Sequence, residues 1–436
     1  MDDAAIRREA TELTADLIRI DTRNPPGNEA PAAHLLMEYL EAAGVECEFA
    51  ARMVDRPNLI ARIAGSGDGP SLALCGHTDV VPADEPGWTH PPFAGHVDGD
   101  GWLWGRGAVD MKNQTATRAV AMAVLARSGF KPKGDLLFIA QADEEDGVEN
   151  VGMRWLVGAR PDLRVDYAID EGGGDRLVLA DGRVVVPIEC GQKATLPVAV
   201  TALGEAGHAS RPQSGANAVP RLAELVRRIA AYAPERRLLP ATARMLDVLA
   251  GPGGDLDERI ARASALHAWV RESLPPLFST TMAPTRLQGS SARNVMPARA
   301  TCEVDCRVLP DTTEADLERE LHEALGDDLP YELQWLDTLI GGASSEIDTP
   351  LYRACQGFLD EADPGAILLP VISSGFADSN YLREAWGTVA YGFWPYRTTP
   401  VEVHETGLHN VNERIHTDDL AYGVRAMLHV VRAMVG

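Results

Sequence analysis

Three short apolar runs in the first 170 residues each end in a cluster of histidine or acidic residues. The runs 71–75, 136–140 and 165–169 have strand length and alternate with stretches that are typical of helices. Buried strands that alternate with helices indicate an α/β domain with a central, mostly parallel sheet. The carboxyl ends of parallel strands meet at one edge of such a sheet, where α/β proteins bind ligands. We therefore expect the three polar clusters to lie close together.

The pattern changes near residue 191 and returns to alternating strands and helices after about residue 340. Between these points, long strand-like runs accompany helical stretches, which indicates a compact, inserted α+β unit. A chain of 436 residues is also too long for one ordinary hydrophobic core. We predict a main α/β domain in two parts, 1–190 and 311–436, with a second domain inserted at 191–310, or to about residue 330.

Composition excludes several classes of protein. Forty Lys and Arg against 64 Asp and Glu give a net charge of −24, so the chain has no general attraction for nucleic acid. No apolar run reaches the roughly 18 residues that a membrane span needs, and the charged N-terminus lacks the apolar stretch of a secretory signal. The six cysteines are scattered and form no CxxC pair. We therefore expect free thiols in a reducing compartment, the cytoplasm.

The first polar cluster contains His77 and Asp79, which directly follow the first apolar run. Two residues apart, they lie on the same side of an extended segment. His77 then suits a metal ligand whose tautomer Asp79 fixes, but a satisfied histidine at a polar strand end fits equally well. Asp110 stands in a glycine-rich loop before a predicted helix. It is either the N-cap of that helix or a bridge between two metal ions.

The second and third apolar runs are followed by acidic residues. The run 143–146 has the sequence Asp-Glu-Glu-Asp. Four adjacent carboxylates repel one another unless cations neutralise some of them, and a solvated loop is the alternative. Asp170 and Glu171 follow the third run, and His404 and His409 come late in the chain. Several carboxylates with two histidines and no cysteine suit catalytic zinc or cobalt rather than a structural site.

In combination, these clusters resemble the motifs of a family of dinuclear-zinc metallopeptidases and amidohydrolases. That family includes aminoacylase, acetylornithine deacetylase, succinyl-diaminopimelate desuccinylase, glutamate carboxypeptidase and carnosine dipeptidase. The resemblance covers nearly the whole chain. Its matching motifs are 76–82, 105–112, 143–145, 170–172, 207–210 and 409–413. It implies a zinc-exopeptidase-like catalytic domain with an inserted lid that also forms a dimer interface.

The resemblance also implies a ligand set for two zinc ions. His77 and Glu171 would hold one ion, Glu145 and His409 the other, and Asp110 would bridge the two. Members of the family often have a cis peptide bond after the bridging aspartate, which here is the bond between residues 110 and 111.

The same resemblance assigns the acid–base residues. Glu144 would be the general base and acid, and Asp79 would orient the ring of His77. Spacing alone does not choose between the two glutamates that follow Asp143, and the family pattern places the base first and the ligand second. It likewise favours Glu171 over its neighbour, and His409 over His404, because residues 410–413 follow His409 as the pattern requires.

Four further residues match the family's lid and substrate loop. His208 matches a lid histidine that stabilises the reacting carbonyl oxygen in relatives, often in the partner subunit, and a plain loop histidine is the alternative. Asn294 and Arg307 would bind the substrate's carboxylate, since a guanidinium grips a carboxylate with two hydrogen bonds. An ordinary surface salt bridge is the alternative for Arg307. The backbone at Gly375 would contact substrate, in a loop less rich in glycine than the family's.

The expected function is metal-dependent hydrolysis of the amide bond of an N-acyl amino acid or small peptide. Two divalent ions per subunit, zinc first and cobalt or manganese as alternatives, would activate water, and Glu144 would move its proton. A ureido or carbamoyl amidohydrolase on the same fold is the alternative among enzymes. A non-catalytic binding protein would have lost a ligand or the base, and all are present by residue type. We expect a homodimer formed through the lid, and neither nucleic acid nor membrane as a partner.

Overall fold

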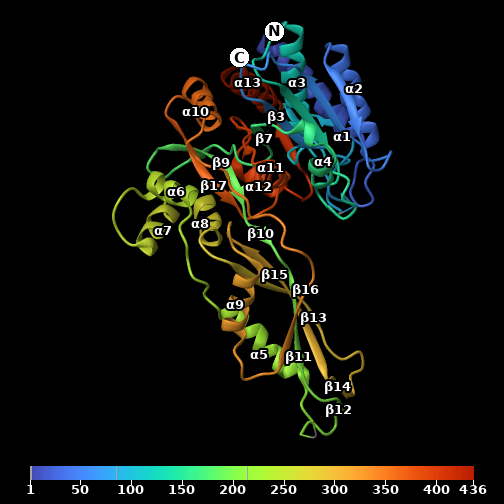
Figure 1. The fold of residues 1–436 in the computed structure, drawn as a ribbon, viewed down its shortest axis with the longest axis vertical. Helices are drawn as coiled ribbons and strands as arrows, with labels where there is room; N and C mark the ends of the chain where they lie inside the picture. Colours follow the sequence, from blue (N-terminus) through green and yellow to red (C-terminus); the bar gives the residue numbers. More distant parts are fainter. Residues whose placement is uncertain (1, 85, 214) are drawn as a thin grey trace.

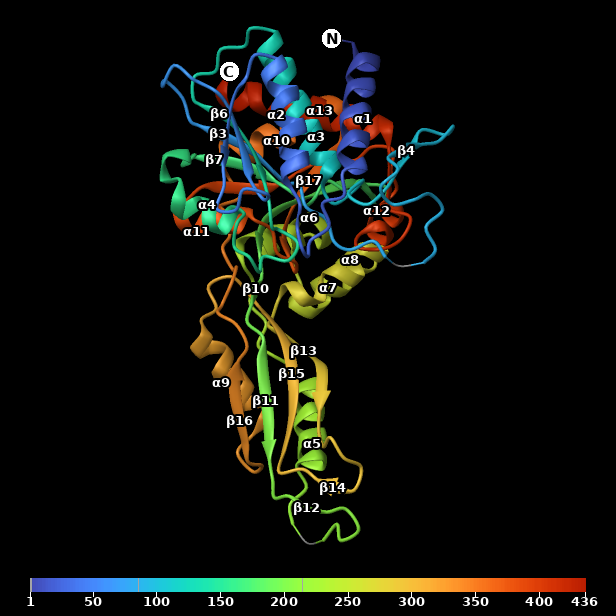
Figure 2. The same cartoon turned by 90° about the vertical axis from the view of Figure 1, so that its right-hand side faces the viewer.

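The computed structural model describes residues 2–84, 86–213 and 215–436 of the chain. They form a rounded unit that contains both ends of the chain, and an elongated unit that projects from it (Figures 1 and 2). The projecting unit comes from the middle of the sequence, coloured green to orange. The rounded unit is therefore discontinuous in sequence, as the pattern of predicted strands and helices indicates.

A nine-stranded sheet, counted over the described residues, forms the centre of the rounded unit. Its order is β1-β2-β6-β3-β7-β18-β9-β17, with β8 paired to β9. The strands are β1 (Glu46–Ala50), β2 (Asn58–Ile63), β3 (Leu72–His77), β6 (Leu136–Gln141), β7 (Tyr167–Asp170), β8 (Leu177–Val178), β9 (Val184–Gln192), β17 (Ala366–Ser373) and β18 (Val389–Gly392). The centre is parallel, because β3 pairs in parallel with both β6 and β7, and β7 with β18. β1 and β2 add antiparallel pairs at one edge, so the α/β sheet is mixed.

Helices cover both faces of this sheet because successive residues of its strands point to opposite sides. In β3, Leu72 and Leu74 pack into the core with α1, α2, α3, α10 and α13, whereas Ala73 and Cys75 pack with α4 and α11. The helices are α1 (Asp3–Arg19), α2 (Ala30–Ala42), α3 (Lys112–Arg127), α4 (Met153–Ala159), α10 (Pro350–Ala362), α11 (Ser379–Trp386), α12 (Val401–Gly407) and α13 (Thr417–Val435). Over the described residues, no helix combines the length and apolarity that crossing a membrane requires.

A second sheet of five strands, again counted over the described residues, supports the projecting unit. It contains β10 (Ala194–Thr195), β11 (Val198–Leu203), β13 (Thr281–Gln288), β15 (Arg299–Val308) and β16 (Tyr331–Trp335). Half-buried and buried residues alternate along most of β15, and its buried side packs against α5 (Ala218–Ala231) and α9 (Glu314–Leu325). Helix α9 spans the residues that its periodicity predicts, and the Thr313 side chain caps it by accepting a hydrogen bond from the N–H of Asp316.

Two small sheets complete the strands. β12 (Gly207–His208) and β14 (Val295–Met296) pair at the end of the projecting unit farthest from the central sheet (Figure 2). β4 (His96–Val97), β5 (Trp102–Trp104) and β19 (Arg414–His416) form a three-stranded sheet. The latter joins the loop that precedes α3 to the segment that follows α12.

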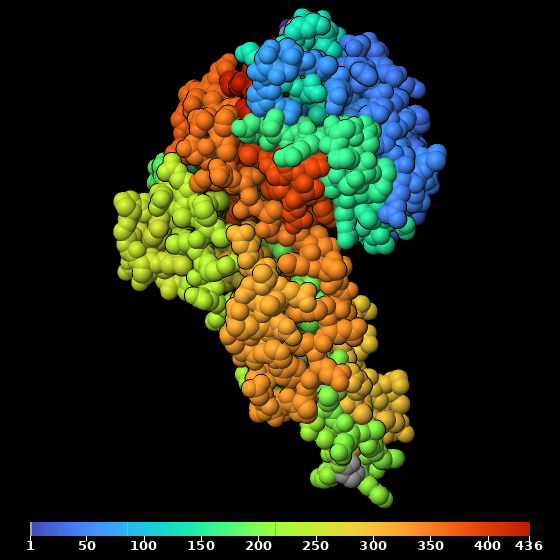
Figure 3. Space-filling model, in the orientation of Figure 1, coloured from blue at the N-terminus to red at the C-terminus, as the bar shows by residue number. Residues whose placement is uncertain are grey.

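The helical stretch within the predicted insertion packs on the rounded unit rather than on the second sheet. It consists of α6 (Pro240–Ala250), α7 (Leu256–Ser264) and α8 (Ala268–Ser273), which lie beside the rounded unit in Figure 3. Met245 and Leu249 of α6 pack against Leu369 and Val371 of β17 in one buried cluster. Periodicity alone predicts the helices but not which core receives their apolar faces.

Candidate active site

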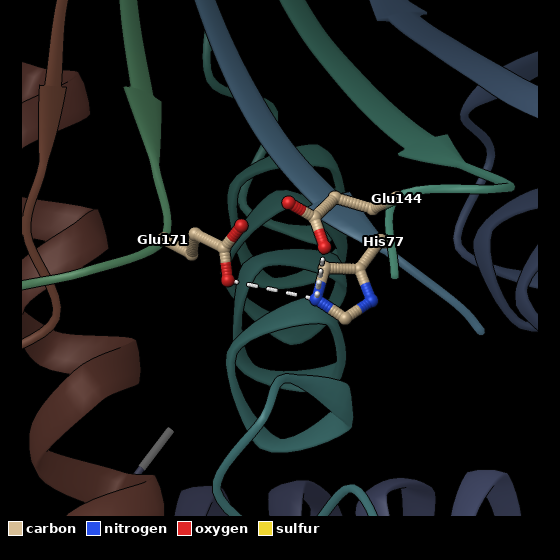
Figure 4. Close-up of side chains that lie close together, drawn as sticks. All are labelled: His77, Glu144 and Glu171. Atoms are coloured by element: carbon tan, nitrogen blue, oxygen red, sulfur yellow. Dashed lines mark ion pairs between the residues drawn. The ribbon is translucent and has the colours of Figure 1, made fainter. Parts of the chain in front are cut away.

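The predicted site residues meet at the carboxyl edge of the central sheet. His77 is the last residue of β3, Glu144 lies in the loop after β6, and Glu171 directly follows β7. Figure 4 shows the three side chains turned toward one another in front of α3. The adjacent parallel strands β6, β3 and β7 end at the same edge, so the sheet itself brings the three polar clusters together.

One half of the site surrounds His77, which is completely buried. Its Nε2 lies 3.2 Å from Oδ1 of Asp110, 3.5 Å from Oε2 of Glu171 and 3.9 Å from Oε2 of Glu144. Its Nδ1 lies 3.0 Å from the backbone oxygen of Asp79 and 3.5 Å from the Asp79 carboxylate. Both groups favour a proton on Nδ1, which leaves Nε2 free to act as a ligand.

The other half of the site surrounds His409. Its Nε2 lies 3.1 Å from Oδ2 of Asp110 and 3.1 Å from Oε2 of Glu145. Asp110 therefore presents one oxygen to each histidine, which is the geometry of a bridging carboxylate. It does not cap α3, because that helix begins at Lys112 and its N-cap residue is Met111. The bond between residues 110 and 111 is cis, as the family resemblance predicts.

Burial and neighbouring charges raise the pKa values of the glutamates of the site. Burial, and then the charge of Glu171, raises the pKa of Glu144 well above its ordinary value. Burial, and then the charge of Asp110, raises the pKa of Glu145 to about 7. Carboxylates this close together resist ionisation because their charges repel one another.

The pKa values of the two histidines are also raised, which favours their protonated form. Burial opposes protonation of His77, but its hydrogen bonds to Asp110 and Asp79 outweigh this and raise its pKa well above the ordinary value. Hydrogen bonds to Asp110 and Glu145 raise the pKa of His409 to about 10. The protonated histidines and the carboxylates of the site therefore attract one another.

This donor set fits divalent metal ions. Two overlapping groups each place three ligand atoms within 4.8 Å of one another: His77, Glu144 and Glu171, and His77, Asp110 and Glu145. Imidazole nitrogens with carboxylate oxygens, and no thiolate, are typical of catalytic zinc sites. Two divalent ions would also supply the positive charge that the perturbed carboxylates require.

The loop that carries Asp110 is held in place by Glu413, which is completely buried. The Glu413 carboxylate accepts hydrogen bonds from the backbone N–H groups of Gly107, Val109 and Asp110 at 2.7–3.0 Å. It also accepts one from Nη1 of Arg106 at 2.9 Å. Glu413 belongs to the 409–413 motif, but sequence reasoning gives it no role, because nothing in the sequence pairs it with a loop 300 residues earlier.

The three predicted lid residues lie away from the metal ligands of the same chain. His208 and Asn294 are exposed at the far end of the projecting unit, where the N–H of Ala209 donates to the backbone oxygen of Asn294. Arg307 is on β15 and forms a 2.8 Å ion pair with Asp305. The salt bridge considered for Arg307 is therefore present, and the roles of all three in substrate binding stay predictions.

A cavity of about 760 Å³ opens beside Asp110 and Glu171. Gly375, the predicted backbone contact for substrate, lines it, and so does α8. The remaining acidic residues and histidines of its wall are Asp175, Glu189, Glu272, Glu402, Glu405, His267 and His404. Over the described residues, neither lysine nor arginine lines the cavity. The space next to the candidate metal centre is therefore strongly acidic.

His404, the alternative to His409, occupies this cavity wall instead of the candidate metal centre. Its Nδ1 lies 2.8 and 3.0 Å from the two carboxylate oxygens of Asp175. Glu405 is close to both, since one ligand atom from each of the three residues lies within 4.8 Å of the others. The structure thus separates two histidines that spacing alone leaves as rivals.

The sequence comparisons identify the family. The profile of peptidase family M20/M25/M40 matches residues 73–433. The chain belongs to this family. The succinyl-diaminopimelate desuccinylase of Methylobacterium sp. (strain 4-46) is 32% identical over 419 residues, which cover 94% of this chain and 91% of the relative. Aminoacylase-1 of Sus scrofa is 27% identical over 433 residues, which cover 97% and 94% of the two chains.

Solved structures of the family share the fold. The M20 family metallo-carboxypeptidase Sso-CP2 from Sulfolobus solfataricus has a TM-score of 0.73 at 18% identity and covers 100% of this chain and 99% of its own. Human carnosine dipeptidase 1 has a TM-score of 0.68 at 16% identity, with 99% and 97% covered. The Bacillus subtilis YXEP protein, described as a dinuclear metal binding peptidase from the M20 family, has a TM-score of 0.63 at 16% identity, with 99% of each chain covered. Together with the profile and the relatives, these likenesses identify an M20 hydrolase that acts on amide or peptide bonds.

Proposed function

We propose that this M20 hydrolase cleaves the amide bond of an N-acyl amino acid or small peptide at a dinuclear metal centre. The observation that carries the proposal is Asp110, whose two carboxylate oxygens face His77 and His409 at 3.2 and 3.1 Å. A carboxylate placed between two imidazoles, each accompanied by a further glutamate, is the arrangement that two metal ions require.

The ligand set follows from the two halves of the site. His77 and Glu171 would hold one ion, Glu145 and His409 the other, and Asp110 would bridge them. Bound zinc, with cobalt or manganese as alternatives, supplies Lewis acidity that lowers the pKa of water and polarises the scissile carbonyl.

Glu144 is suited to move the proton of the attacking water. Its carboxylate lies 3.9 Å from Nε2 of His77 and makes no closer ion pair over the described residues, so it borders the centre and remains available. In this role Glu144 accepts the proton as water attacks and delivers it to the leaving nitrogen, whose departure completes hydrolysis. Asp79 supports the base, because its carboxylate accepts the N–H of Glu144 at 3.3 Å.

The cavity limits what part of a substrate can occupy it. Metal would neutralise Asp110 and Glu171. Of the five other carboxylic acids of the wall, burial raises the pKa of Glu189 to about 8, and Asp175 pairs with His404. Glu272, Glu402 and Glu405 remain, with no lysine or arginine over the described residues. A substrate carboxylate in this space would meet the like charges of these three exposed side chains. We infer that the group bound there is neutral or cationic, which favours aminoacylase-like or peptide substrates over acyl groups with a terminal carboxylate.

We assign the lid residues to substrate binding in a homodimer. His208 would stabilise the developing oxyanion, and Asn294 and Arg307 would bind the substrate's carboxylate, with Gly375 contacting substrate through its backbone. The position of His208 at the end of the projecting unit supports a role in the active site of a second copy.

We also place the enzyme in a reducing compartment, the cytoplasm, because all six of its cysteines are free.

The test is hydrolysis of a panel of N-acyl amino acids, dipeptides and ureido acids with added zinc or cobalt, and with a chelator control. We expect chelator-sensitive release of an amino acid. Glu144→Gln is expected to lower kcat by about 10²–10⁴-fold, the contribution of a general base, while retaining two zinc ions per chain.

Asp146→Asn is the matched control, because Asp146 is an exposed acid of the same run. Asp146→Asn should leave kcat and the zinc content per chain unchanged. Near-normal turnover by metal-loaded Glu144→Gln would remove Glu144 from the mechanism. Turnover of ureido acids alone would move the enzyme to the other reaction class.

A further inference from the structure

A buried cation lies directly behind the acidic run that supplies Glu144 and Glu145. Arg56 is 1% exposed, although it follows an exposed loop and belongs to none of the motifs of the site. It forms hydrogen bonds to the Glu29 carboxylate from Nε, at 2.9 and 3.2 Å, and from Nη2 at 2.6 Å. The same Nη2 reaches Oδ1 of Asp143 at 3.1 Å.

Asp143 needs this support because of its backbone. Its φ of 61° lies in the left-handed region that residues other than glycine rarely adopt. Its carboxylate is tied on both sides: Oδ1 accepts from Arg56 and from Asn24, and Oδ2 accepts from the N–H of Val151 at 3.2 Å. Its own N–H donates to Glu29 at 3.3 Å. The turn that precedes Glu144 is therefore fixed by side chains rather than by a regular element.

A second chain of hydrogen bonds links this turn to the candidate metal centre. Asn24 donates from Nδ2 to Asp143 at 3.1 Å and to Oδ2 of Asp79 at 3.0 Å. The Asp79 carboxylate accepts the N–H groups of Glu144 at 3.3 Å and Glu145 at 3.1 Å. Arg56 thus reaches the backbone of both glutamates through three intermediate side chains, without touching either one.

We propose that Arg56 is a positioning residue that sets the base Glu144 and the ligand Glu145, and through Glu145 the metal ion on the His409 side. This inference rests on the proposed function. Among the described residues, Arg56 is the one arginine or lysine bonded to this network, where it faces the carboxylates of Glu29 and Asp143. Removing it would leave buried carboxylates in mutual repulsion at the base of the turn that carries both glutamates.

The shape of the site requires arginine rather than any cation. The guanidinium fork binds Glu29 through two nitrogens and Asp143 through one, which a lysine ammonium cannot reproduce with the same geometry. Gly27 packs against the flat of the guanidinium: a Cβ added there would lie 2.2 Å from Cζ of Arg56. Gly27→Ala therefore displaces the arginine without removing its charge, and the φ of 81° at Gly27 adds backbone strain of its own.

The other side of the candidate metal centre has support of its own besides the contact between His77 and Asp79. Arg118 donates to the backbone oxygen of Cys75, two residues before His77, and at 2.8 Å to that of Asp170, directly before Glu171. Loss of Arg56 should therefore weaken the ion held by Glu145 and His409 before the ion held by His77 and Glu171. This asymmetry separates positioning from a general loss of structure.

The experiment measures zinc per chain after dialysis, zinc affinity by competition with a chelating dye, and kcat and KM. The variants are Arg56→Met, Arg56→Lys and Gly27→Ala. Arg353→Met is the matched control, because Arg353 forms a 2.6 Å pair with Asp348 on the surface of the same unit and is 62% exposed.

We expect Arg56→Met to retain about one zinc ion where wild type retains two, with the weaker site reduced about 10–100-fold in affinity, the usual effect of removing a group that supports ligands. With zinc added to saturation, kcat should still be lowered about 10–100-fold and KM little changed, because Glu144 remains displaced. Arg56→Lys should recover part of the lost zinc affinity and kcat. Gly27→Ala should show both losses, and Arg353→Met should behave as wild type.

Circular dichroism and thermal melting identify variants that have lost their fold. If Arg56→Met has lost its fold, the zinc content and kcat of Arg56→Lys and Gly27→Ala test the role of Arg56 instead. A folded Arg56 variant with two tightly bound ions and normal kcat would overturn the inference. So would equal weakening of both sites. Wild-type protein that binds fewer than two ions, or shows no chelator-sensitive turnover, would instead overturn the proposed function.

Discussion

Glu413→Gln tests whether the loop of the bridging aspartate is held by one buried carboxylate. Oε1 of Glu413 accepts the N–H groups of Val109 and Asp110 at 2.7 and 3.0 Å. Oε2 accepts the N–H of Gly107 at 3.0 Å and Nη1 of Arg106 at 2.9 Å. A glutamine keeps one oxygen and presents an NH₂ group in place of the other, so two of the four donors lose their acceptor.

The orientation of the new amide can be worked out. A hydrogen bond from a charged donor is stronger than one from a neutral donor, so the glutamine oxygen should turn to Arg106. The N–H groups of Val109 and Asp110 then face an NH₂ group. Two buried donors without acceptors cost about 2–6 kcal/mol together. With an unfolding entropy of about 2.1 cal/mol/K per residue, the 436 residues give roughly 0.9 kcal/mol/K, hence a Tm lowered by about 2–7 °C.

The assay is thermal melting in the presence of a chelator, so that loss of metal does not contribute to the change in Tm. Glu12→Gln is the control, because Glu12 is exposed on α1. Zinc content is measured separately and should fall in Glu413→Gln, since the disturbed N–H belongs to the bridging residue. A Tm within 1 °C of wild type, with two zinc ions retained, would refute the reasoning.

Two further predictions concern the acidic cavity. Burial opposes protonation of His404, but Asp175 outweighs it and raises the pKa above the ordinary value, so this pair stabilises the fold below about pH 6.5 and ceases to do so as pH rises through the raised pKa. His404→Gln should therefore lower stability by about 1.5–3 kcal/mol at pH 6 and by less at pH 9.5, and melting curves with an equal deficit at both values would contradict this. Substrates matched in size but carrying a cationic, neutral or anionic group should show kcat/KM falling by about tenfold or more, at least 1.4 kcal/mol, for the anionic member. Glu405→Gln should narrow that difference, and an anionic substrate that is preferred by wild type would refute the charge argument.

Much of the site is predictable because metal ligation restricts residue types at strand ends. His77, Asp110, Glu145 and Glu171 stand in short local patterns, and parallel pairing of β6, β3 and β7 brings three of these patterns to one edge of the sheet. The choice of His409 over His404 required the residues that follow it. Ligand motifs of this kind consist of neighbouring residues, so they can be predicted from the sequence alone.

The supporting network is not predictable in the same way. Asn24, Glu29 and Arg56 lie 87–119 residues before Asp143 in sequence where they touch it, and nothing local to them indicates burial. An arginine next to an exposed loop is ordinarily a surface residue. The apolar faces of α6–α8 pose the same difficulty, because amphipathicity predicts burial without naming the surface that provides it. Pairing across long separations depends on the assembled fold and not on local pattern.

The placement of buried arginines follows from the chemistry that the site must perform. Arg56 bonds to Glu29 and Asp143, Arg106 to Glu413, and Arg118 to backbone oxygens beside the ligands. Over the described residues, none of these guanidinium groups forms a salt bridge with a carboxylate assigned to metal. A guanidinium bonded to a ligand oxygen would compete with the metal ion for the same lone pairs. Arg56 and Arg106 instead neutralise carboxylates that hold the ligand-bearing loops, and Arg118 binds backbone oxygens, so the ligand oxygens stay free. The carboxylates assigned as ligands thus keep their negative charge for metal, while the supporting carboxylates Glu29, Asp143 and Glu413 are neutralised by arginine.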